Sequence, residues 1–139
     1  MVGIVVLCHG RMAEALLETA EMIVGPHAQV ASVPFTADMS LEDYRDSVAM
    51  ASETVDCGDG ALFLADLQGG TPCNVAALAS TMRNSRVVTG VNVPMLVTVL
   101  LSREGVDIDD LSGLACGAGI EGIQAVNLSD GGTEETHID

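Results

Sequence analysis

Lysine and tryptophan are absent from this chain of 139 residues, and aromatic residues make up only 2% of it. A core without large rings has to be filled by aliphatic side chains and methionine, which agrees with the apolar fraction of 48%. Without lysine, the chain cannot contain the phosphate-binding loop Gly-x-x-x-x-Gly-Lys-Ser/Thr. A nucleotide site of that kind is therefore excluded.

Long apolar runs and a recognisable signal peptide are missing as well. The first apolar run, at residues 2–7, is short and is not preceded by a basic residue. No other run approaches the roughly 18 apolar residues that a membrane-spanning helix needs. We therefore expect a cytoplasmic protein that does not enter the membrane.

Cysteine pairs of the kind that bind metals are also absent. The four cysteines lie far apart and form no Cys-x-x-Cys pair; they are Cys8, Cys57, Cys73 and Cys116. This spacing predicts neither a zinc site nor a disulfide framework. We expect four small buried side chains, no metal and no cofactor.

Positive charge is scarce. Five arginines stand against 20 acidic residues, which gives a formal net charge of −15. Such a surface repels nucleic acid and anionic lipid, so neither is expected as a partner. It favours basic protein partners, or it is a solubility feature of a protein from a salt-rich cell. The sequence leaves both interpretations open.

Apolar, β-branched runs alternate along the chain with segments of helical periodicity. The runs predict strands at 2–8, 29–35, 61–65 and 86–91, with a short last strand at 123–128. The other segments predict helices at 13–24, 40–55, from 71 onward, 94–103 and 107–118. This order is typical of an α/β fold with one open, mainly parallel sheet in the order 2-1-3-4 and helices on both faces. We expect one domain, 1–128, and a disordered acidic tail, 129–139.

Two polar residues follow predicted strands whose ends would be neighbours in this sheet. His9 comes directly after the first strand and Asp66 directly after the third. Binding sites of open α/β sheets form beyond the carboxyl ends of strands, where the strand order reverses. A carboxylate that accepts one imidazole N–H fixes the tautomer and leaves the other nitrogen nucleophilic. The alternatives are a purely structural His9 and an Asp66 that only starts a turn.

Glycines surround these two residues. Gly10 follows His9 and permits a tight turn, while Gly69 and Gly70 precede a predicted helix and would expose backbone amides to an anion. Thr71 either caps that helix through its hydroxyl or donates to a phosphoryl oxygen. Together these residues predict a phosphoryl acceptor with His9 as nucleophile. Because nucleotide-binding machinery is absent, another phosphoprotein is the expected donor.

Five short segments stand out in order along the chain: Cys-His-Gly at 8–10, Ala-Glu-Ala-Leu at 13–16, Glu-Met-Ile-Val-Gly at 21–25, Asp-Leu-Gln-Gly-Gly-Thr-Pro at 66–72 and Gly-Val-Asn-Val-Pro-Met-Leu at 90–96. In sequence and in order, they resemble the mannose-type enzyme IIA family of the sugar phosphotransferase system, and the likeness runs from about residue 2 to residue 128. Each motif alone is modest, but the five at these spacings are specific. Two positions depart from the family pattern, since Cys8 replaces a common threonine and Gln68 a common aromatic residue.

The resemblance implies a role, a set of partners and a site. A family member accepts a phosphoryl group from phospho-HPr on a histidine, here Nε2 of His9, and passes it to a IIB component, which phosphorylates sugar at the membrane permease. Asp66 matches the carboxylate that orients the ring, and Thr71 a hydroxyl near the phosphoryl group. Family members are often homodimers that exchange a C-terminal strand, here residues 122–128. The chain ends where a fused IIB would begin, so we expect a separate IIB.

Other functions remain as alternatives. One is the phosphoryl-carrier subunit of a dihydroxyacetone kinase, which the Gly-Gly-Thr-Pro turn argues against. Another is a receiver-like module with Asp66 as acceptor, which would need an acidic pair after the first strand and a lysine. A third is a non-catalytic regulator whose phosphorylation state is read by another protein. A Gly-x-Gly-x-x-Gly match at 117–122 follows a helix rather than a strand, so dinucleotide binding is not expected.

Overall fold

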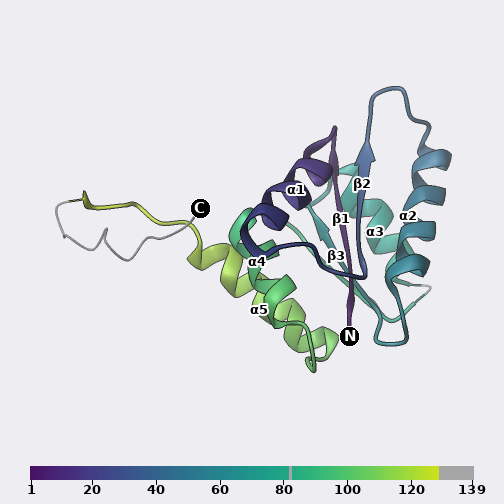
Figure 1. Cartoon of the computed structure of the whole chain (residues 1–139). Helices are drawn as coiled ribbons and strands as arrows, with labels where there is room; N and C mark the ends of the chain where they lie inside the picture. The colour runs from purple at the N-terminus through teal and green to yellow at the C-terminus, as the bar shows by residue number, and fades with distance from the viewer. Residues whose placement is uncertain (82, 129–139) are drawn as a thin grey trace.

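The computed structural model of the chain describes residues 1–81 and 83–128. Strands and helices alternate through most of it (Figure 1). The strands are β1 (Gly3–His9), β2 (Val30–Phe35), β3 (Ala61–Ala65) and β4 (Ser85–Val88). The helices are α1 (Met12–Val24), α2 (Leu41–Val55), α3 (Thr71–Ser80), α4 (Val93–Ser102) and α5 (Ile108–Glu121).

The four strands form one parallel sheet in the order β2-β1-β3-β4. β1 and β3 are the central strands, and the last residues that pair between these two strands are Leu7 and Ala65. The α/β class, the parallel pairing and the predicted strand order are thereby confirmed. The order reverses between β1 and β3, so the site expected at this switch point has a defined place at the carboxyl end of the sheet.

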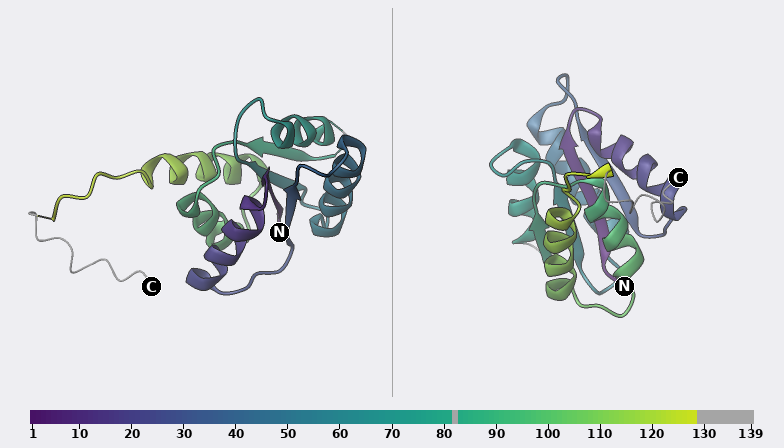
Figure 2. Two further views of the ribbon diagram at one scale, coloured as in Figure 1. Left: turned by 90° about the horizontal axis from the view of Figure 1, so that it is seen from above. Right: turned by 90° about the vertical axis from the view of Figure 1, so that its left-hand side faces the viewer.

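Two apolar layers separate the sheet from its helices. Alternate residues of β1 face opposite sides, so that Ile4 and Val6 join the core under α1, α4 and α5, while Val5 and Leu7 join the core under α2 and α3. Figures 1 and 2 show these two groups of helices on opposite faces of the sheet. The central strands are therefore buried on both faces, which explains their continuous apolar runs.

Most element boundaries lie within a residue or two of those predicted. The fourth strand is an exception, because it ends at Val88 rather than at residue 91. Gly90 turns the chain with a positive φ of 77°, after which the N–H of Val91 donates to the carbonyl of Ala65 at 3.0 Å. The chain thus leaves the edge of the sheet and crosses toward the end of β3, next to the predicted site.

The short last strand predicted at 123–128 does not form in the single chain. Residues 123–127 have no regular secondary structure, and they extend away from the body of the molecule (Figure 2). A strand needs a neighbour for its backbone hydrogen bonds, and none of the strands in the described part of the chain pairs with this segment. The predicted tail, 129–139, lies outside the described residues.

Candidate phosphoryl-transfer site

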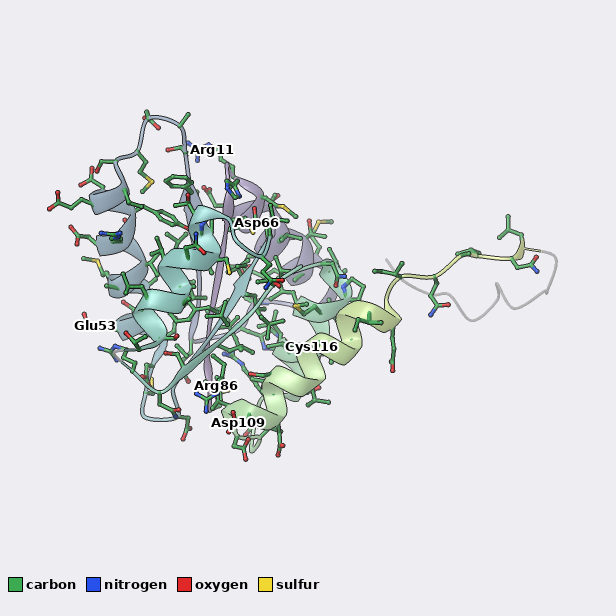
Figure 3. The ribbon with its side chains drawn as sticks, turned by 180° about the vertical axis from the view of Figure 1, so that it is seen from behind. Arg11, Glu53, Asp66, Arg86, Asp109 and Cys116 are labelled. Atoms are coloured by element: carbon green, nitrogen blue, oxygen red, sulfur yellow. The ribbon has the colours of Figure 1, made fainter. Side chains whose placement is uncertain are left out.

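The candidate site lies at the carboxyl end of the two central strands. His9 is the last residue of β1 and Asp66 is the first residue after β3. They are 57 positions apart in sequence, and the strand order makes them neighbours. Figure 3 shows Asp66 at the same end of the molecule as Arg11, whereas Arg86 and Asp109 lie at the other end.

Asp66 holds His9 at two points through one oxygen. Its Oδ2 accepts a hydrogen bond from the backbone N–H of His9 at 2.8 Å, and it lies 2.8 Å from Nδ1 of the same residue. Because a carboxylate only accepts hydrogen bonds, Nδ1 carries a proton and Nε2 keeps its lone pair in the neutral ring. The side chain of His9 is 48% exposed and that of Asp66 only 14%. The free nitrogen, Nε2, therefore belongs to His9, the more exposed residue of the pair.

The ionisation of Asp66 fits this role. Burial alone would raise the pKa of its carboxyl group, but the hydrogen bonds from the His9 backbone and ring, together with the ring's charge, outweigh burial and hold the pKa below its usual value. Asp66 is consequently a carboxylate at neutral pH. A negative group at this distance stabilises positive charge on the ring as it reacts.

Gly70 leaves the space that the imidazole occupies. A Cβ atom at this position would lie 2.7 Å from Cε1 and 3.5 Å from Nε2 of His9. Gly70 is also the N-cap residue of α3, so the free nitrogen faces the beginning of a helix. The first amides of a helix have no acceptor within it, and they are suited to bind an anion.

Two further glycines shape the loops on either side of the ring. Gly10 has a φ of 60° and Gly69 a φ of 84°, which other residues rarely adopt. Gly10 also exchanges backbone hydrogen bonds with Phe35, at 2.8 and 3.2 Å. This contact closes the turn after His9 onto the end of β2, and leaves the ring at the rim of the sheet.

Thr71 does not cap α3. The cap is Gly70, without a side-chain hydrogen bond, and Thr71 is the first residue of the helix. Its half-buried side chain lines a groove of about 200 Å³ between α2 and α3, together with Leu41 and Asn74. The helix begins one residue earlier than a threonine cap requires, because the flexible Gly70 supplies the extended cap conformation.

Sequence reasoning did not single out Phe35, which pairs with His9 across β1 and β2. The two rings meet edge to face, with centroids 6.1 Å apart. Its position as the last residue of the second strand was the available signal, since parallel strands end at one edge. Phe35 makes an apolar contact with one side of the His9 ring. The hydrogen bond that orients the ring comes from Asp66.

The comparisons with known proteins agree with this geometry. Residues 3–114 match the profile of the EIIA-man family, described as "PTS system fructose IIA component". The chain belongs to this family. The fructose-specific EIIA component of Bacillus subtilis is 33% identical over 113 residues, which cover 80% of this chain and 77% of that protein. The mannose-specific EIIAB component of Escherichia coli K12 is 35% identical over 127 residues, or 90% of this chain.

Solved structures give the same result for the fold of this IIA chain. The EIIA component from Streptococcus agalactiae superposes with a TM-score of 0.82 and 31% identity, over 94% of this chain and 99% of that one. The mannose/sorbose-specific IIA subunit from Enterococcus faecalis gives 0.81 and 34%, over 91% and 95%. The chain spans only 39% of the E. coli EIIAB protein, so it corresponds to part of that relative.

Metal-binding clusters and membrane-spanning helices are both absent from the described part of this IIA chain. Among residues 1–81 and 83–128, no cluster of His, Cys, Asp and Glu is arranged to hold a metal ion, and no helix in that part is long and apolar enough to cross a membrane.

Cys8 is buried as expected, and burial together with the charge of Asp66 raises its thiol pKa to about 12. The prediction of four buried cysteines was wrong for Cys57 and Cys116, which are exposed.

Proposed function

We propose that this IIA chain is a phosphocarrier of the sugar phosphotransferase system, which accepts a phosphoryl group from phospho-HPr on Nε2 of His9 and donates it to a separate IIB component. The observation that carries the proposal is the 2.8 Å contact between Nδ1 of His9 and Oδ2 of Asp66. It leaves Nε2 as the exposed, unprotonated nitrogen beside Gly70. Membership of the IIA family supplies the class of reaction.

The transfer step follows from this arrangement. The lone pair of Nε2 attacks the phosphorus, a nitrogen–phosphorus bond forms on His9, and the bond between phosphorus and the donor breaks with its electrons going to the donor. The proton stays on Nδ1, where Asp66 stabilises the positive ring. The reverse step, toward IIB, uses the same contacts, because neither bond of the Asp66 carboxylate to His9 involves Nε2.

The glycine loops provide the proposed phosphoryl-binding groups. Gly70 brings the amino end of α3, with Gly69 and Thr71 on either side of it, close to Nε2, and Gly10 forms the turn directly after His9. Amides and a hydroxyl at a helix N-terminus stabilise the charge on transferring oxygens. No cofactor is required, since the phosphoryl group moves directly between protein side chains.

Asp66 is the poorer candidate for the acceptor. Its side chain is 14% exposed against 48% for His9, and its Oδ2 is already engaged by two nitrogens of His9. Its other oxygen, Oδ1, is buried, so attack by Asp66 on a phosphoprotein would first require the carboxylate to become exposed. This argues against the receiver-like alternative.

We further propose that this IIA chain forms a homodimer in which the two chains exchange residues 122–128. Three apolar side chains of this segment are largely exposed in the single chain: Ile123 at 77%, Val126 at 76% and Leu128 at 73%. β4 is an edge strand, paired only with β3 in the described sheet. Open strand edges and exposed apolar side chains both favour pairing with another chain. A partner's segment on this edge would supply the missing last strand.

The test is phosphorylation in a reconstituted system. The full chain is incubated with phosphoenolpyruvate, enzyme I and HPr, and the bound phosphate is mapped and tested for acid and alkali stability. We expect an acid-labile, alkali-stable phosphate on His9, transfer abolished in His9→Gln, and transfer slowed at least tenfold in Asp66→Asn, which loses a charged partner. Absence of phosphate on His9 with competent carriers would refute the proposal. Phosphate that persists in His9→Gln and disappears in Asp66→Asn would assign the acceptor to Asp66.

A further inference from the structure

Tyr44 carries a buried hydroxyl for which the described residues offer no partner. It lies in the first turn of α2, at the carboxyl end of the sheet, and the whole residue is inaccessible. Its Oη makes no hydrogen bond to any described residue. Buried hydroxyl groups are normally paired, because burial without a partner costs free energy. A phenylalanine would fill the same space without this cost, so the hydroxyl calls for a role.

Asp66 presents the matching acceptor. Oδ2 receives both nitrogens of His9, whereas Oδ1 is buried and has no hydrogen-bond partner among the described residues. A carboxylate oxygen has room for about two hydrogen bonds. One donor and one acceptor are therefore left unpaired at the same end of the sheet.

A stack of rings connects Tyr44 to the site. Its ring packs on Phe35 with centroids 4.6 Å apart, and Phe35 meets the ring of His9 at 6.1 Å. α2 also packs against β1, the strand that ends in His9. Tyr44 is thus buried at the same end of the sheet as the His9–Asp66 pair, and Phe35 contacts both its ring and the ring of His9.

We propose that Tyr44 is a positioning residue for the His9–Asp66 pair, whose hydroxyl donates through one buried water to Oδ1 of Asp66. Buried waters commonly link polar groups that have no other partner. The bridge would fix the plane of the carboxylate, so that Oδ2 remains directed at the ring. The inference concerns the geometry of the pair; its consequence for transfer rests on the proposed function.

The electrostatic coupling of these groups agrees with this arrangement. Burial is the main cause that raises the pKa of Tyr44, and the negative charges that Cys8 and Asp66 can carry raise it further. The titratable groups that face Asp66 are His9 and Cys8 from β1 and Tyr44 from α2. Of these, only Tyr44 is a neutral hydroxyl donor on the buried side.

The experiment compares Tyr44→Phe with Ser52→Ala in the full chain without phosphate. Tyr44→Phe keeps the ring and removes the hydroxyl. Ser52→Ala removes another buried hydroxyl from α2 that has no partner among the described residues. Carboxyl ¹³C NMR then follows the titration of Asp66. Because a lost donor destabilises the carboxylate, we expect its pKa to rise by about 0.5 to 1 in Tyr44→Phe and to stay unchanged in Ser52→Ala.

The outcomes separate this inference from the proposed function. An unchanged Asp66 titration in Tyr44→Phe, or an equal change in Ser52→Ala, would overturn the positioning role. In the phosphorylation assay we expect transfer to be roughly three- to tenfold slower in Tyr44→Phe. If the wild-type chain accepts no phosphate, the proposed function fails, yet the titration still decides whether the hydroxyl reaches Asp66.

Discussion

Exposure and hydrogen bonding divide the tasks between single residues of the site. The side chain of His9 is half exposed and keeps one ring nitrogen free. Asp66 is mostly buried, and its Oδ2 accepts hydrogen bonds from both the backbone N–H and the ring of His9. Gly70 has no side chain, and its φ of −78° is one that any residue adopts. A glycine is needed at position 70 because the His9 ring lies so close, not because of the backbone conformation. A substitution at this position therefore tests the site without straining the backbone.

Gly70→Ala should impair transfer while leaving the fold intact. The new Cβ would lie 2.7 Å from Cε1 of His9, so the ring has to move and its contact with Asp66 lengthens. We expect phosphorylation of His9 at least tenfold slower, with a free energy of unfolding within about 1 kcal/mol of wild type. Phosphotransfer kinetics and urea unfolding give the two quantities.

Gly113→Ala is the matched control for Gly70→Ala. Gly113 lies inside α5, and a Cβ there meets nothing within 4 Å. This variant should transfer at the wild-type rate. Equal rates for Gly70→Ala and wild type would show that the ring tolerates the added carbon, and would remove Gly70 from the site.

At the scale of elements, α4 and α5 pack closely because glycines face the start of α4. A Cβ at Gly119 would lie 2.8 Å from Met95, and one at Gly122 would lie 2.4 Å from Pro94. The Gly-x-Gly-x-x-Gly match at 117–122 is thus part of a helix and its C-cap. Gly119 and Gly122 thus serve helix packing, whereas a Cβ at Gly117 would meet nothing within 4 Å.

Asn92→Ala should destabilise this helix pair. Oδ1 of Asn92 caps α4 by accepting from the N–H of Met95 at 3.0 Å, and Nδ2 donates to the carbonyl of Gly119 at 3.0 Å. Losing both should lower the free energy of unfolding by about 1 to 2 kcal/mol. Urea denaturation at one fixed protein concentration measures this, since association also contributes to stability.

Asn92→Ser separates the two contributions of Asn92. Serine keeps a capping oxygen but cannot reach the carbonyl of Gly119. We therefore expect the free energy of unfolding of Asn92→Ser to lie between those of wild type and Asn92→Ala. If serine and alanine destabilise equally, the cap contributes nothing, and only the contact with α5 matters.

At the scale of the whole molecule, the site and the free edge of the sheet are separate features. His9 and Asp66 belong to the central strands, while β4 lies at the margin and the segment after α5 extends away from it (Figures 1 and 2). Pairing with a second chain would therefore cover apolar surface without directly rebuilding the His9–Asp66 contact. Dimerisation and the geometry of that pair can be tested independently.

Replacing Ile123 and Val126 by serine in the full chain should weaken the dimer. Both side chains are about three-quarters exposed in the single chain, and burying two such side chains against a partner contributes roughly 3 kcal/mol. Because both chains of the dimer carry the changes, the loss per dimer is about twice that, and we expect the dissociation constant to rise roughly 10,000-fold, as measured by light scattering across a concentration series. Gln124→Ser, a polar change in the same segment, should leave it unaltered. A monomeric wild-type chain, or equal dissociation constants, would contradict the proposed exchange.

Local patterns predicted most of the scaffold. The predicted helices 40–55 and 107–118 begin at Ser40 and Asp107, and these residues cap α2 and α5, each accepting a backbone N–H three residues later, because capping depends on neighbours in sequence. Burial was harder to predict. Leu41 lies on the apolar face of α2 by its spacing from Tyr44 and Val48, yet it is 46% exposed. Helical periodicity identifies a face, whereas the extent of burial depends on how α3 is placed beside it.

The sequence by itself determined the alternation of strands and helices, the position of His9 and Asp66 at strand ends, and the glycines that flank them. These features depend on short stretches of chain and on backbone preferences. Only the tertiary structure decided that Oδ2 of Asp66 serves both nitrogens of His9, that Nε2 faces Gly70, and that the hydroxyl of Tyr44 is buried without a partner among the described residues. Such contacts join residues brought together by strand order and helix packing, so no local pattern specifies their distances.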